Sequence, residues 1–87
     1  MDETTIRLSK HLGGRELLAA SLVFKTGSAT NEEICDALDV SQMEASNTVA
    51  RLIRKGWVKR ITFGRDGKAV SELRPDKNLE EVAANGK

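Results

Sequence analysis

The sequence predicts an α+β fold in which a core of three helices is followed by a two-stranded β-hairpin. Two helix-start signals, T-N-E-E at 30–33 and S-Q-M-E at 41–44, each precede apolar residues at helical spacing, and they predict two consecutive helices. A third observation predicts the hairpin, because the dipeptide Asp66-Gly67 separates two short runs that suit strands. At 87 residues the chain has the length of one domain.

The composition argues against disulfide-bonded, metal-binding and membrane-spanning proteins. The single cysteine excludes an internal disulfide and favours a reduced, cytoplasmic setting, and with one histidine the chain lacks a cluster of soft metal ligands. The longest apolar run, residues 17–24, is far too short to span a membrane, and the acidic N-terminus lacks the apolar segment of a signal peptide. We therefore expect a cytoplasmic protein with no cofactor, no bound metal and no membrane association.

The chain before the two signals divides into an ambiguous segment and a helix. In residues 1–14 the apolar residues fit either a short strand or part of a helix, because alternation and helical spacing are both present. From Arg15 to Lys25 strong helix formers dominate, and Gly27 follows as a stop signal. We expect the apolar stripe of this helix to face the core. Its members are Leu17, Leu18, Ala20, Ser21, Leu22 and Phe24.

The first capped helix begins at Thr30. The Thr30 hydroxyl can accept a hydrogen bond from the Glu33 amide while the Glu33 carboxylate reaches back to Thr30, which is the reciprocal arrangement called a capping box. The helix must be short, and Asp39 is expected to take the turn position with positive φ that glycine often fills. Cys35 has no basic neighbour or matching histidine, so we interpret it as a small, half-buried core residue rather than a nucleophile.

Residues 41–55 form the second capped helix, with Ser41 as the cap and Glu44 as its reciprocal partner. The face opposite its apolar stripe is small or polar in the first half and basic in the second. This order suits a helix that enters the major groove of DNA, where Gln, Asn and Arg can hydrogen-bond to base edges. An exposed amphipathic helix with a solvated outer face is the alternative interpretation. The outer-face residues are Gln42, Met43, Ser46, Asn47, Ala50, Arg51 and Arg54.

The hairpin is predicted directly after this helix, since Gly56 stops the helix and residues 57–63 suit a strand. The G-R-D-G-K turn places two basic residues, Arg65 and Lys68, at the tip of the hairpin. Pro75 ends the return strand, because proline cannot donate to the strand ladder. A sheet that merely covers the core, with tip charges that serve solubility, is the alternative interpretation.

The chain therefore divides into an N-terminal segment (1–14), one domain (15–75) and a C-terminal short helix or tail (76–87). In the last segment Asp76 can cap a helix and Gly86 can end it. A helix there would present a thin apolar stripe made of Leu79, Val82 and Ala83.

Charge is distributed unevenly along the chain, although the formal net charge is only +1. Residues 28–40 carry four acidic and no basic side chains, whereas residues 41–68 carry seven basic and two acidic ones. A local excess of positive charge favours a partner with a phosphate backbone. A solvated surface without a nucleic-acid partner would explain the same distribution, so charge does not decide between them.

The stretch from T-N-E-E to G-W-V-K-R resembles the winged helix-turn-helix superfamily, in the manner of MarR-like and ArsR-like bacterial regulators. The run E-I-C-D-A-L-D-V-S at 33–41 and the run L-I-R-K-G-W-V at 52–58 match its helix pair, and R-D-G-K with E-L-R-P resembles its wing. The resemblance covers roughly residues 15–75. It implies a winged helix-turn-helix fold with a three-helix core, a C-terminal two-stranded wing and a short final helix.

The resemblance also implies roles for individual residues. Base edges would be faced by Gln42, Met43, Ser46, Asn47 and Arg51. Contacts with the DNA backbone and from the wing would come from Thr30, Arg54, Lys55, Arg60, Arg65 and Lys68. Glu44, near the start of the helix, would either serve only as part of the cap or read a cytosine amino group.

Two hypotheses for function follow. The first is a sequence-specific protein that binds double-stranded DNA, a small transcriptional regulator acting as a homodimer on a palindromic site. The second is a winged-helix module that binds a protein partner, in the manner of phage- or plasmid-type accessory factors, without binding DNA. Enzymatic activity is not expected, because the sequence has no nucleophile–base arrangement, no phosphate-binding glycine loop and no metal-ligand spacing.

Overall fold

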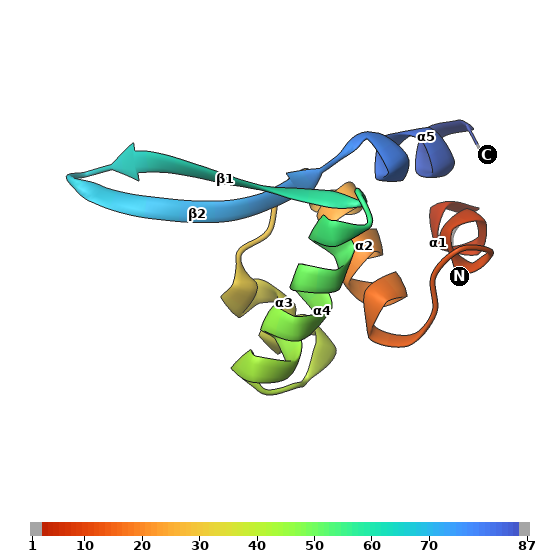
Figure 1. The fold of residues 1–87 in the computed structure, drawn as a ribbon, viewed down its shortest axis with the longest axis horizontal. Helices are drawn as coiled ribbons and strands as arrows, with labels where there is room; N and C mark the ends of the chain where they lie inside the picture. The colour runs from red at the N-terminus through yellow and green to blue at the C-terminus, as the bar shows by residue number, and fades with distance from the viewer. Residues whose placement is uncertain (1–2, 86–87) are drawn as a thin grey trace.

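The computed structural model describes residues 3–85 and folds them into helices and one antiparallel hairpin. The hairpin projects from one side of the helical body, and α1 and α5 lie at the opposite end (Figure 1). The expected α+β fold is confirmed, and in the described part of the ambiguous N-terminal segment residues 3–9 form a helix. The elements are α1 (Glu3–Ser9), α2 (Gly14–Thr26), α3 (Asn31–Leu38), α4 (Gln42–Arg54), β1 (Val58–Arg65), β2 (Lys68–Pro75) and α5 (Lys77–Asn85).

Helices near both ends of the chain contribute residues to the core. Leu8 of α1 and Leu79 of α5 are completely buried, and α1 and α5 pack side by side. The Arg7 guanidinium of α1 donates a hydrogen bond of 2.8 Å to the carbonyl oxygen of Ala83 in α5. The stripe expected for the final helix is confirmed, whereas the Gly86 stop signal lies outside the described residues. No helix within residues 3–85 has the length and apolar character needed to cross a membrane.

The buried face of α2 differs from the expected stripe. The fully buried residues of α2 include Ala19, Ala20 and Val23. The side chain of Leu18, in contrast, faces outward, and this residue is 54% exposed. The buried face is thus rotated toward the two alanines, whose small side chains allow neighbouring helices to approach α2 closely. The expectation that Leu18 belongs to the core is therefore wrong.

Helix α3 has the predicted boundaries because both of its end signals are satisfied. Thr30 Oγ1 accepts a hydrogen bond of 3.1 Å from the Glu33 amide, and Glu33 Oε1 accepts one of 3.0 Å from the Thr30 amide. Asp39 adopts φ 55° and ψ 52°, and its amide donates to the Cys35 carbonyl oxygen. Cys35 is half-buried and has a free thiol, as expected.

The base of the hairpin is fastened to the segment before α3. Ala29 and Leu73 exchange two backbone hydrogen bonds of 2.9 and 2.7 Å and form an isolated β-bridge. Leu73 is buried, as is Val58 at the start of β1, so this side of the hairpin faces the core. The wing therefore begins at a fixed position beside α3.

The hairpin has a regular register up to its two-residue turn. Val58 lies opposite Pro75 at the base, and Arg65 lies opposite Lys68 at the tip. The turn residues Asp66 and Gly67 have φ values of 51° and 76°. Positive φ at both positions matches the twist of the flanking strands, which is why an Asp-Gly pair favours this turn. The predicted hairpin turn is confirmed.

Helix α4 ends at a corner where β1 and α5 also begin. Gly56 turns the chain with a φ of 81°. Asn78 Nδ2 donates a hydrogen bond of 2.9 Å to the Lys55 carbonyl oxygen, and the Asn78 amide donates one of 3.3 Å to the Gly56 carbonyl oxygen. These bonds satisfy carbonyl groups that the end of a helix leaves without intrahelical partners. The start of α5 thus caps the end of α4.

We expect Gly56→Ala to lower the free energy of unfolding by about 1–2 kcal/mol, because alanine is disfavoured at positive φ. Its Cβ would also lie 3.0 Å from Nδ2 of Asn78. Gly64→Ala is the matched control, since its Cβ would meet nothing within 4 Å. The control should change stability by less than about 0.5 kcal/mol. Urea unfolding followed by circular dichroism measures both variants, and equal effects would contradict the role assigned to Gly56.

Candidate nucleic-acid interface

The outer face of α4 is the first part of the candidate interface. Successive residues of an α-helix are rotated by about 100°, so the side facing away from the core is fixed once the buried side is known. The buried side consists of Ala45, Thr48, Val49 and Leu52. Met43 is 74% exposed near the middle of the opposite side. The exposed residues of α4 that share this outer face are Gln42, Met43, Ser46, Asn47, Ala50 and Arg54.

The polar side chains of this face are available to a partner. No hydrogen bond or ion pair within residues 3–85 engages the side chains of Gln42, Ser46, Asn47 or Arg54. An exposed Asn or Gln amide can offer a donor and an acceptor together, which suits the edge of adenine. Arg54 lies about two helical turns beyond Asn47 and adds a positive charge.

The start of α4 is capped, but only half of the expected capping box is present. Ser41 Oγ accepts a hydrogen bond of 3.2 Å from the Glu44 amide. The Glu44 carboxylate accepts one of 3.3 Å from the Ser41 hydroxyl and pairs with the Arg15 guanidinium at 2.7 Å. The expected bond from the Ser41 amide to Glu44 is absent from the described residues. One carboxylate oxygen instead accepts from the Ser41 hydroxyl, and the other pairs with Arg15. Glu44 is therefore occupied within the protein.

Arg51 and Lys55 lie on a flank of α4 that faces α2. Arg51 Nε is 3.5 Å from Glu16 Oε2, and Lys55 Nζ is 3.2 Å from Glu16 Oε1. The buried Thr48 hydroxyl accepts a hydrogen bond of 3.5 Å from Arg51 and donates one of 2.9 Å to the Glu44 carbonyl oxygen. Arg51 thus lies beside the outer face of α4, not at its centre.

Two further cations lie at the tip of the hairpin. Arg65 and Lys68 are opposite each other in the strand register, and both are exposed. The Arg65 guanidinium lies 5.5 Å from the centre of the Phe63 ring, a contact that steadies the long side chain. The hairpin carries these charges well beyond the helical body (Figure 1).

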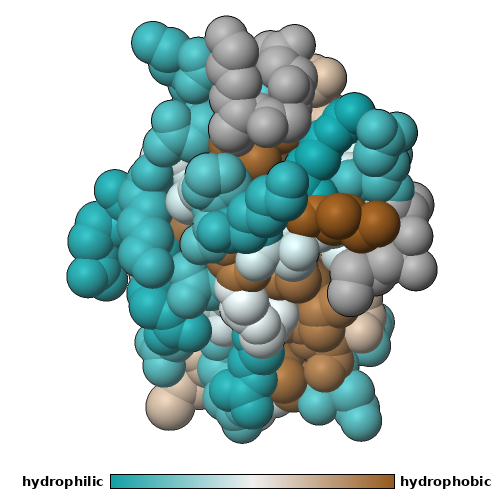
Figure 2. All heavy atoms as spheres, turned by 90° about the vertical axis from the view of Figure 1, so that its right-hand side faces the viewer, coloured by the Kyte–Doolittle hydropathy of each residue, from teal (hydrophilic) through white to brown (hydrophobic). Residues whose placement is uncertain are grey.

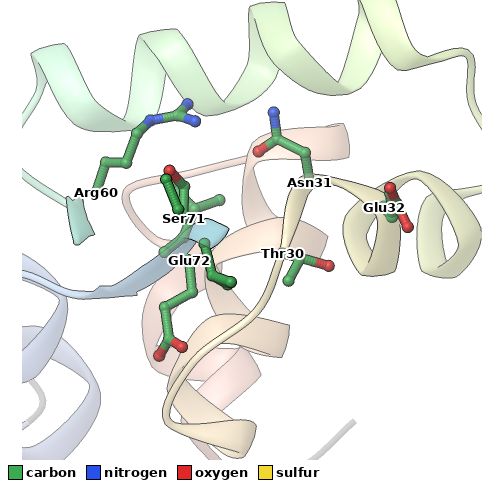
Figure 3. Close-up of a pocket in the computed structure, with 9 residues that line it drawn as sticks. Thr30, Asn31, Glu32, Arg60, Ser71 and Glu72 are labelled. Atoms are coloured by element: carbon green, nitrogen blue, oxygen red, sulfur yellow. The ribbon is translucent and has the colours of Figure 1, made fainter. Parts of the chain in front are cut away.

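Thr30 and Arg60 both line a pocket of about 330 Å³ between the start of α3 and the hairpin. Figure 3 shows the side chains of Arg60 and Asn31 extending to one side of this pocket and that of Glu72 to the other. The pocket is lined by Thr30, Asn31, Glu32, Arg60, Ala69, Val70, Ser71, Glu72 and Leu73. Among the residues that the structure describes, no group of three or more His, Cys, Asp or Glu side chains is arranged to hold a metal ion.

Glu72 is the one pocket residue with a perturbed carboxyl group. Arg74 Nε donates a hydrogen bond of 3.0 Å to Glu72 Oε2, and this bond lowers the pKa of Glu72. The lowered pKa favours the charged carboxylate in the folded protein. The contribution of this pair to stability is therefore present at neutral pH and is lost as the pH falls through the pKa of the folded protein.

Sequence reasoning did not identify Arg15 and Glu16 as neighbours of the candidate interface. The bond between Glu16 and Lys55 joins residues that are 39 positions apart. Neither helical spacing nor local charge gives a signal for such a pair. Only the crossing of α2 over α4 brings these residues together.

Residues 24–69, just over half of the chain, match the sequence model of the MarR family. The chain belongs to the MarR family. No curated protein matches it. Among solved structures, the crystal structure of the reduced form of MarR from E. coli is similar, with a TM-score of 0.72 and 17% sequence identity. At that identity the likeness shows the fold, and the predicted winged helix-turn-helix is confirmed.

The two MarR-family chains differ in extent. The match covers 94% of this chain and 63% of the E. coli MarR chain. This chain therefore spans less than two thirds of the length of its structural relative. The family match runs from the end of α2 through α3, α4 and β1 and includes the first two residues of β2.

We expect Arg74→Met to raise the pKa of Glu72 toward its ordinary value, because the guanidinium donor is removed. NMR titration of the side-chain carboxyl carbons would measure the change. Lys77→Met removes a positive charge that is not among the groups lowering this pKa, and it should leave the pKa of Glu72 unaltered. Equal shifts in the two variants would show that general charge, not the hydrogen bond, lowers the pKa.

Proposed function

We propose that this MarR-family chain is a transcriptional regulator that binds double-stranded DNA and reads the major groove with the outer face of α4. The observation that carries the proposal is the character of that face. Its side chains are exposed, most are short or polar, and the polar ones have no internal partners among the described residues. Gln42, Met43, Ser46 and Asn47 would lie nearest the base edges. The family membership and the fold support this assignment.

The remaining candidate residues would bind the DNA backbone. Arg54 extends the outer face toward the end of α4, where a phosphate contact is favourable. Arg65 and Lys68 would reach the minor groove from the tip of the hairpin, and Thr30 and Arg60 would approach a phosphate beside α3. Arg51 and Lys55 would contribute from the flank of α4, where each is paired with Glu16 in the free protein.

A homodimer is the second part of the proposal, because a palindromic site requires two copies related by a two-fold axis. The surface at the α1–α5 end supports it. Figure 2 shows apolar residues reaching the surface at this end of the molecule. Ile6 of α1 is 48% exposed, although it is a large apolar residue. Association through this end would leave α4 and the hairpin open.

A protein-binding module without DNA binding is the alternative function. The exposed Met43 favours it, because a flexible apolar side chain on an exposed helix face suits a protein surface. The first turn of α3 favours it too, since Glu32 and Glu33 would face a polyanion at close range. The absence of enzymatic activity stays a prediction under both functions.

We expect Arg65→Ala with Lys68→Ala to weaken binding to all duplexes alike. Two lost phosphate contacts should reduce the slope of log affinity against log salt by about 1.8. Asn47→Ala should instead weaken the sequence selected from a randomised duplex pool and leave random duplexes unaffected. Filter binding between about 50 and 200 mM salt measures both. If the chain retains no duplex from the pool even at low salt, DNA binding is refuted and the protein-binding alternative is favoured.

We expect the chain to sediment at twice its own mass at micromolar concentration. Ile6→Lys should shift it toward the monomer, because a charge would enter the apolar contact. Ala37→Lys, at an exposed position of α3, is the matched control and should leave the mass unchanged. A chain that remains monomeric up to about 100 μM, well above typical specific affinities, would contradict the homodimer.

A further inference from the structure

Two consecutive residues at the start of α2 engage the whole flank of α4. Arg15 pairs with Glu44 in the first turn of α4 at 2.7 Å. Glu16 pairs with Arg51 and Lys55 near its end, at 3.5 and 3.2 Å. The flank is acidic at the start of α4 and basic at its end, so the Arg15 guanidinium pairs with the acidic end and the Glu16 carboxylate with both cations. We call these five residues the flank cluster.

Glu16 is the innermost member of the flank cluster. Its side chain is 19% exposed, whereas those of Arg51 and Lys55 are 43% and 54% exposed. The buried Thr48 hydroxyl lies beneath Arg51 and fixes the near side of the guanidinium. The two cations are therefore held from the inside by a carboxylate, while their outer sides remain open to solvent.

The Glu16 carboxylate binds Arg51 and Lys55 in the way that a DNA phosphate group would bind them. A carboxylate with one oxygen on a guanidinium and the other on an ammonium is a compact anion with charge-assisted hydrogen bonds. Half-exposed ion pairs of this kind are weak enough to exchange. Glu16 thus neutralises charge that would otherwise attract any duplex, whatever its sequence.

We propose that Glu16 is a positioning residue that holds Arg51 and Lys55 on the α2 side of α4 and limits their attraction for DNA of any sequence. Specificity depends on the ratio of specific to non-specific affinity. Glu16 lowers the affinity for DNA of any sequence. Discrimination between DNA sequences then depends on the outer face of α4, where Ser46 and Asn47 lie. This inference rests on the proposed function, because it concerns how the same surface treats different duplexes.

The test is Glu16→Gln in the full chain, with binding to a random-sequence duplex measured across a range of salt concentrations. Glutamine keeps the shape of the side chain and removes its charge. We expect non-specific affinity to rise on the order of tenfold at low salt and the salt slope to steepen by about 0.9 to 1.8. Glu81→Gln, which removes the same charge at an exposed position of α5, should change the slope little.

A double-mutant cycle separates this role from a general effect on folding. In a chain that already carries Arg51→Gln and Lys55→Gln, Glu16→Gln should no longer alter affinity or salt slope, because the charges it restrains are gone. A purely structural role for Glu16 would change binding in both backgrounds. Thermal unfolding of each variant shows that the compared chains are folded.

The outcomes distinguish this inference from the proposed function. If the unmodified chain binds duplex DNA and Glu16→Gln leaves the salt slope unchanged or weakens every duplex, the role of Glu16 is refuted and DNA binding stands. If Glu16→Gln strengthens binding equally in both backgrounds, the effect does not pass through Arg51 and Lys55, and the inference is again refuted. If neither the unmodified chain nor the variant retains duplex DNA, the proposed function itself fails.

Discussion

The position of α4 depends on the corner that closes its C-terminal end. Gly56 turns the chain with a positive φ, and Asn78 of α5 donates to the carbonyl groups of the two residues that follow α4. The same corner starts β1, so the helix and the hairpin share one rigid origin. Leu79, the residue after Asn78, is completely buried in the core. The position of Asn78 is therefore fixed by the burial of its neighbour as well as by hydrogen bonds. A change at this corner would therefore move α4, the wing and α5 together.

Helix α4 presents three surfaces with different physical characters. Its apolar side is buried among α2, α3 and the base of the hairpin, and this burial supplies most of its stability. Its outer face carries Ser46 and Asn47 without internal partners among the described residues. Its flank is filled by ion pairs with α2, above all those of Glu16. A single helix is thus buried on one side, open to solvent on another and ion-paired with α2 on the third.

The hairpin adds reach but depends on α3 for its direction. The two hydrogen bonds between Ala29 and Leu73 hold its base beside the start of α3, and beyond them the strands pair only with each other. The regular register and the Asp66-Gly67 turn then place Arg65 and Lys68 together at the tip. The pocket between α3 and the hairpin follows from this geometry, because the strands leave the body at an angle.

Features whose chemistry lies within a few residues follow from the local sequence. The Thr30 capping box, the positive φ of Asp39 and the turn at Asp66-Gly67 are local, and each was predicted correctly. Helical spacing also gave most of the outer face of α4, because rotation per residue is fixed by the helix itself.

Other features depend on packing between segments that are distant in the sequence, and they become visible only in the folded protein. Residues 3–9 form a helix because α5 covers Leu8, and Leu18 is exposed because α2 packs through its alanines. The flank cluster could not be foreseen, since the partners of Glu16 lie on another helix. The same physical reason explains the incomplete capping box at Ser41: a distant arginine competes for the carboxylate that local spacing assigned to the cap.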